Sequence, residues 1–156
     1  MSAPVPPFAV QADEGTCLET PAGGHVTIKA HTRSTNGSMS VLEIAVPPKG
    51  GPGLHTHLRE DELWWVLEGE FRFRAGDRLL HAAAGGMAFG PRNLPHAFQN
   101  VGDTSGRLLV ITTPSGLERF FEQFAASPGG ADVVAEVGLA NWIEFSGPPL
   151  AVSDPL

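Results

Sequence analysis

Short segments in which apolar and polar residues alternate dominate the chain, and glycine or proline separates them. Residues 39–46 alternate in this way and end at two prolines, which predicts a strand with one buried face. Residues 62–67 and 71–74 predict a hairpin, because Phe71 and Phe73 alternate with two arginines. The same pattern predicts further strands at residues 78–81, 86–89, 96–101 and 107–113. Eight or more short strands are typical of an all-β sandwich or barrel.

One helix is expected after these strands. Ser115 and Glu118 have the spacing of a capping box, in which a hydroxyl and a carboxylate each bond a free N–H of the first turn. The apolar residues that follow at helical spacing predict a face that packs on the outside of the barrel: Leu117, Phe120, Phe121 and Phe124. A weaker helical pattern covers residues 131–141, and the proline-rich residues 147–156 are expected to be extended.

Length and composition fit one domain with one core. The chain has 156 residues, of which 42% are hydrophobic. We expect an N-terminal extension over residues 1–20 that could act as an arm, a β-barrel over residues 21–114, and a helix with an extended tail over residues 115–156.

The charge balance excludes several classes of partner. Ten basic residues against seventeen acidic ones give a net charge of -7, and the basic residues are scattered, so nucleic acid is not an expected partner. No apolar run approaches the roughly 18–20 residues of a membrane helix, and residues 1–11 lack the features of a signal peptide. We therefore expect no membrane contact and a cytoplasmic location. Cys17 is the only cysteine, which excludes an intrachain disulfide.

Three histidines and one glutamate are the candidate chemical groups. His55 and His57 are two residues apart, so on an extended strand their imidazoles share a face. Glu62 adds a carboxylate five residues later, and His96 follows a turn-forming segment far along the chain. Such a set suits one divalent transition metal ion (Fe, Mn, Co, Ni, Cu or Zn) and leaves coordination positions open.

These residues also have the spacing of two motifs of a known superfamily. The chain has the motif residues His55, His57, Glu62, Gly69, Gly85, Pro91, His96 and Asn100. In this it resembles the cupin superfamily. There are two departures: Gly50 is one residue too close to His55, and Asn93 replaces the turn glycine, which asparagine can do because it tolerates a left-handed backbone. The resemblance implies a small jelly-roll barrel whose mouth holds a metal bound by His55, His57, Glu62 and His96.

Strand parity indicates which side chains surround the metal. Trp64 shares a strand face with Glu62, and Phe98 shares one with His96, so both are candidate substrate-binding residues, although both could equally be core residues. Met39, Met87 and Phe89 are further candidates for the cavity wall. Residues 59–61 form a charged run that is expected to be a solvated turn, and a charge role at the entrance of the cavity is the second interpretation.

The resemblance is greatest to the small single-domain cupins related to quercetin 2,3-dioxygenase, and residues 57–70 carry most of it. It implies a metal-dependent dioxygenase that acts on an enolic or phenolic small molecule, flavonol-like or polyketide-like. Glu62 would be the catalytic base that accepts the proton of the substrate hydroxyl.

Two other functions use the same four residues. One is an isomerase, cyclase or lyase in which the cation acts as a Lewis acid without O2. The other is a non-catalytic module that binds a small ligand. The expected partners are a small-molecule substrate, O2 and, by the same resemblance, a second copy of the chain in a homodimer.

Overall fold

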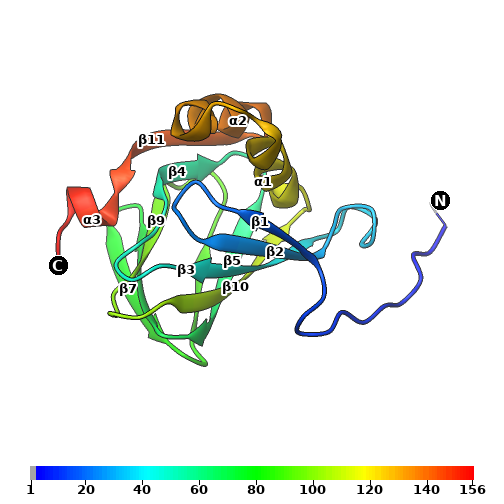
Figure 1. The fold of residues 1–156 in the computed structure, drawn as a ribbon, viewed down its shortest axis with the longest axis horizontal. Coiled ribbons are helices and arrows are strands. Elements are labelled where there is room, and N and C mark those ends of the chain that lie inside the picture. Colours follow the sequence, from blue (N-terminus) through cyan, green and yellow to red (C-terminus); the bar gives the residue numbers. More distant parts are fainter. Residues whose placement is uncertain (1–2) are drawn as a thin grey trace.

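Two antiparallel sheets pack face to face in the computed structural model, which describes residues 3–156 (Figure 1). The first sheet has the strand order β1 (Thr16–Glu19), β2 (His25–Ala30), β3 (Ser40–Val46), β10 (Gly106–Thr113), β5 (Asp61–Glu68) and β8 (Met87–Gly90). The second has the order β11 (Ile143–Pro149), β4 (Gly53–His57), β9 (His96–Asn100), β6 (Glu70–Ala75) and β7 (Arg78–Ala83). The predicted all-β barrel is therefore confirmed.

The core lies between the sheets and follows the predicted alternation. In β3 every second residue is buried, and β5 buries Trp64 and Val66 while Trp65 faces outward. Phe71, Phe73 and Phe98 fill the facing side from the second sheet. Each large apolar side chain that is fully buried stabilises the fold by about 1.5–3 kcal/mol relative to its exposed state.

The first helix forms where expected, but its N-terminus differs. Helix α1 (Leu117–Ala126) has Gly116 as its N-cap and no side-chain cap, so the capping-box prediction is wrong. Glu118 is buried, and its carboxylate instead accepts hydrogen bonds from the hydroxyls of Thr32 and Ser40 and from the Gly116 N–H. Thr32 lies before β3 and Ser40 lies on it, so the spacing of residues within the helix could not indicate these two partners.

The C-terminal segment folds over one end of the barrel. After α1 come a 3-10 helix (Gly130–Val133), α2 (Val134–Ala140), β11 and α3 (Leu150–Ser153). Helix α2 lies against β11 (Figure 1), and α1 contacts α2, β1 and β3. The expected extended tail is thus a paired strand followed by a helical turn. Arg72 of β6 contacts Asp154 (Nη1 to Oδ2, 3.4 Å), and Arg74 lies 3.1 Å from the same carboxylate. These contacts hold the end of the chain against the second sheet.

The N-terminal segment has two parts. Residues 3–10 extend away from the barrel (Figure 1), whereas β1 pairs with β2, so the expected boundary at residue 20 follows a strand of the first sheet. Lys29 fixes the junction by donating from Nζ to the carbonyl oxygens of Gln11, Ala12 and Glu14. No helix within residues 3–156 combines the length and apolar character needed to cross a membrane.

Candidate metal centre

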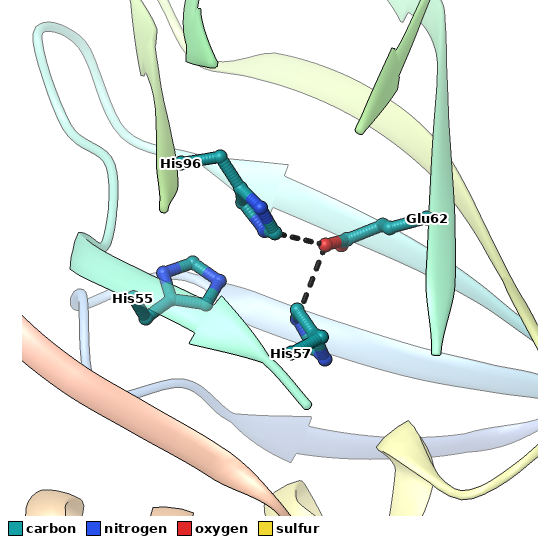
Figure 2. Close-up of side chains that lie close together, drawn as sticks. All are labelled: His55, His57, Glu62 and His96. Carbon is teal, nitrogen blue, oxygen red and sulfur yellow. Dashed lines mark hydrogen bonds and ion pairs between the residues drawn. The ribbon is translucent and has the colours of Figure 1, made fainter. Parts of the chain in front are cut away.

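Three strands bring the four predicted ligands together. His55 and His57 lie on the inner face of β4, His96 pairs with His55 across β4 and β9, and Glu62 points in from β5 of the opposite sheet (Figure 2). One potential ligand atom from each residue lies within 4.8 Å of those of the others, and all four residues are buried. Oε2 of Glu62 lies 2.9 Å from Nε2 of His96 and 3.1 Å from Nε2 of His57.

Backbone carbonyls orient two of the three imidazoles. Nδ1 of His55 lies 2.8 Å from the Gly53 oxygen, and Nδ1 of His96 lies 3.1 Å from the Leu94 oxygen. A carbonyl only accepts hydrogen bonds, so each Nδ1 is a donor, and Nε2 is the nitrogen that would bind a metal. The turn before His96 is fixed by the Asn93 N–H, which donates to the His57 carbonyl, and Asn93 has the expected left-handed backbone (φ 64°).

The charges in the cluster are strongly coupled. Burial alone would raise the pKa of Glu62, but the charge and hydrogen bond of His57, together with His96, hold it well below its ordinary value. Burial alone would lower the pKa of His57, but the Glu62 and Glu60 carboxylates raise it to about 9. For His55, burial and the neighbouring imidazoles lower the pKa to about 3. A proton on His57 thus balances the negative charge of Glu62. A metal cation bound between these residues would balance that charge in place of the proton.

The donor set fits a first-row transition metal. Three imidazoles and one carboxylate are the ligand types that such metals prefer, and four protein ligands leave positions open for an ion that takes five or six. His55, His57, Glu62 and His96 are the residues that would hold it.

Glu60 is a functional candidate that the sequence reasoning missed. It was expected in a solvated turn, yet it is 1% exposed, and its Oε2 lies 3.5 Å from Nδ1 of His57. Arg59 and Asp61 are partly exposed, and Asp61 pairs with Arg92. The signal was present in the two-residue period of β5, because Glu60 has the same parity as Glu62 and Trp64.

A cavity of about 350 Å³ opens from the cluster. His55, His57 and Glu62 form part of its wall, and the remainder is mostly apolar: among others Ile44, Val46, Phe98, Leu117, Phe120, Phe121, Val134, Ile143 and Phe145. Helices α1 and α2 contribute one side of the cavity, and β11 contributes residues from the edge of the second sheet. Among residues 3–156, no lysine or arginine lines this cavity. Phe98 lies in the wall, and its role in substrate binding stays a prediction.

The other substrate-binding candidates lie elsewhere. Trp64 is fully buried and packs edge-on against His96 with 5.1 Å between ring centroids. It therefore supports the candidate metal ligand His96 and does not line the cavity. Met87 and Phe89 are 44% and 51% exposed, and the expectation that they line the cavity is corrected. The register explains this: Trp64 pairs with Ala88 and Glu62 with Gly90, so the small residues of β8 face inward. Met39 is also exposed and borders the N-terminal segment instead.

Comparisons with known proteins agree with this fold. A family model described as "Cupin domain" matches residues 42–112. A curated "Oxalate-binding protein" from Thermotoga maritima is 29% identical over 68 residues, which are 44% of this chain and 56% of that protein. The match therefore spans little more than half of the relative.

Solved structures show the same fold. KdgF from Halomonas sp. superposes with a TM-score of 0.62 at 16% identity, over 70% of this chain and 94% of KdgF. An oxalate oxidase superposes with a TM-score of 0.56 at 25% identity, over 69% of this chain and 59% of that protein. The chain has the cupin jelly-roll fold, and these matches support the cupin superfamily. The narrower likeness to quercetin 2,3-dioxygenases stays a prediction.

Proposed function

We propose that this chain is a metal-dependent dioxygenase that acts on an apolar enolic or phenolic small molecule. The observation that carries the proposal is the position of the four-residue cluster: His55, His57 and Glu62 line a cavity whose other surfaces are mostly apolar. A substrate oxygen could reach the metal there while the carbon skeleton leaves water. The volume, about 350 Å³, is at the lower end of the usual range for small-molecule sites.

The cavity wall favours a neutral substrate over a small dicarboxylate. The relatives include proteins named for oxalate. A carboxylate transferred into an apolar cavity needs a cationic or hydrogen-bonding partner to offset its lost hydration. The metal could bind one carboxylate group, but within the described part of the chain no lysine or arginine in the cavity wall offers a partner to a second one. An aromatic substrate, in contrast, can pack against Phe98 and Phe120.

The protein side chains have separate roles in this proposal. When bound, a redox-active divalent metal would supply the electron transfer that allows O2 to react with an organic substrate. Glu62 would accept the proton of the substrate hydroxyl at its carboxylate. A carboxylate held by a dication is a weak base, so this role requires Glu62 to move away from the metal when the substrate arrives. The apolar wall would exclude water and orient the ring.

Oxygen consumption tests the proposal. The metal-free protein is reloaded separately with Fe, Mn, Co, Ni, Cu or Zn and mixed with flavonols and 1,3-diketones in an oxygen-electrode cell. We expect uptake with at least one redox-active metal and none with Zn or in Glu62→Gln. Turnover under anaerobic conditions would instead support the isomerase, cyclase or lyase alternative. Tight binding with no turnover under any condition would leave a binding module and contradict the proposal.

We also infer that the chain forms a homodimer. Three large apolar side chains on the outer face of the first sheet are 44–51% exposed: Trp65, Met87 and Phe89. Trp65 of β5 pairs with Met87 of β8, and Phe89 lies two residues further along β8. Aromatic residues and methionine are enriched in the buried centres of protein interfaces, which supports this face as the contact.

A further inference from the structure

We propose that Glu60 is a positioning residue that orients His57 toward the metal and strengthens it as a ligand. The proposal rests on the metal centre of the proposed function but not on its substrate or on the use of O2. Glu60 lies outside the four-ligand cluster and does not line the cavity.

His57 differs from the other two imidazoles in what its outer nitrogen meets. Nδ1 of His55 and of His96 each contact a neutral backbone carbonyl. Nδ1 of His57 instead lies 3.5 Å from Oε2 of the Glu60 carboxylate. Both atoms are buried and have no hydrogen-bond partner among the described residues, so the contact joins two polar atoms that are otherwise unpaired. Burial of unpaired polar atoms is costly, which argues that the contact has a use.

The surroundings of Glu60 hold its carboxylate in this orientation. Nε and Nη2 of Arg59 both lie 3.2 Å from Oε1, so the second oxygen, Oε2, is left for His57. Gly116, the N-cap of α1, packs against the side chains of Arg59 and Glu60. A Cβ at position 116 would lie 2.6 Å from Nη2 of Arg59 and 3.1 Å from Oε1 of Glu60. The close approach of the helix start keeps water from the carboxylate and limits its movement.

The chemical consequence follows from the acceptor charge. A carboxylate that receives the Nδ1 proton fixes the tautomer in which Nε2 has the lone pair, and Nε2 is the atom that faces Glu62. A negative acceptor also increases the electron density that the ring donates to a metal, more than a neutral carbonyl does. His57 is therefore expected to be the strongest of the three imidazole ligands. The 3.5 Å separation should shorten to hydrogen-bond length when a metal binds.

The test compares Glu60→Gln with Glu60→Asp. Gln keeps the side-chain length and removes the charge, whereas Asp keeps the charge and shortens the side chain. Co2+ and Zn2+ affinities are measured by competition with a chromophoric chelator. We expect Glu60→Gln to lower the affinity about 10- to 100-fold and Glu60→Asp to recover part of the loss. If Glu60 only fills space, the order reverses, because Gln fits the site better than Asp does.

A matched control separates this effect from the loss of any buried carboxylate. Glu118 is also buried but is not one of the four clustered residues, and Gln at this position keeps an oxygen that can accept from the Gly116 N–H, so Glu118→Gln should leave both affinities unchanged. A second readout uses the Zn2+ form: the Nδ1 proton of His57 should resonate downfield in the wild type and move upfield in Glu60→Gln. Equal affinity and an unmoved proton in Glu60→Gln would overturn the proposal. A wild type that binds neither metal would overturn it together with the metal centre, whereas metal binding without O2 uptake would count against the proposed function alone.

Discussion

His55 and His96 face each other directly across β4 and β9, with ring centroids 4.5 Å apart. The two strands are far apart in the sequence, so this pair joins both halves of the candidate metal centre. Because His55 and His57 share one face of β4, the same pairing places all three imidazoles opposite Glu62.

Loss of His96 should therefore remove the metal. We expect His96→Ala to bind Co2+ at least 100-fold more weakly than the wild type, because the centre loses one of its protein ligands and the packing partner of His55. Metal content after dialysis against a fixed free Co2+ concentration checks this. His81→Ala, which changes an exposed histidine of β7, is the control and should retain the wild-type content. Full occupancy in His96→Ala would contradict the assignment of ligands.

Phe98 should contribute to substrate affinity more than to the chemical step. Replacement of Phe98 by Leu removes an aromatic contact in the cavity wall, worth about 0.5–1.5 kcal/mol. We expect KM for an aromatic substrate to rise about 2- to 12-fold, with little change in kcat. Phe89→Leu makes the same change on the outer surface, where the side chain is exposed, and should leave KM unaltered. Equal KM values in the two variants would argue against an aromatic substrate in this cavity.

Glu118 should make stability depend on pH in the acidic range. Burial alone would raise its pKa, but hydrogen bonds from Ser40 and Thr32 outweigh burial and hold the pKa below its ordinary value of 4.5. His31, whose Nδ1 lies 3.5 Å from the carboxylate, also faces it. A pKa that is lower in the folded state gives stability that is fully present above pH 4.5 and is lost as the pH falls through the folded-state pKa.

Glu118→Gln tests this sign. At pH 7 the variant should unfold at lower urea concentration, with a loss of about 1–3 kcal/mol, because buried hydroxyls lose a charged acceptor. The difference from the wild type should shrink as the pH falls below 4.5. Urea titrations of both proteins at pH 7 and in the acidic range provide the comparison. A difference that grows with acid would show that the carboxylate does not have a lowered pKa.

A charge on the outer face of β8 should separate the dimer. Met87 is exposed beside Trp65, and Met87→Glu would place a carboxylate at the centre of the proposed contact. Light scattering after size exclusion should give the mass of one 16.4 kDa chain for the variant and twice that mass for the wild type. Leu79→Glu, at a similarly exposed position on the other sheet, is the control and should stay dimeric. A monomeric wild type contradicts the proposed homodimer.

The fold could be predicted from local spacing, and the clustering of the four candidate metal ligands could be predicted from the cupin motifs that the sequence resembles. Alternation assigns the buried face of each strand, and the two-residue separation of His55 and His57 places both on one face of β4. His96 was identifiable because the turn before it has a motif of fixed length, and Asn93 adopts the backbone that this turn requires.

Features that depend on packing between distant segments could not be predicted. Ser115 and Glu118 have capping spacing, but Ser40 and Thr32 compete for the carboxylate from another part of the chain. Parity alone did not give the register of β8. There, Gly90 faces inward, and only glycine fits this position because a Cβ would lie 2.6 Å from Trp64. Its neighbour Phe89 therefore faces outward. The residues that α2 and β11 contribute to the cavity likewise depend on how the C-terminal segment docks.

The strand that carries two of the ligands owes much of its pairing to the end of the chain. β4 pairs with β9 at His55 and His96, whereas its pairing with β11 runs from Gly53 to His57. Until residues 143–149 have folded onto it, β4 is therefore expected to be a weakly paired edge strand. A metal ion that arrives earlier meets the imidazoles on an incompletely paired strand, so full capture of the ion is expected to be among the last events in the maturation of this protein.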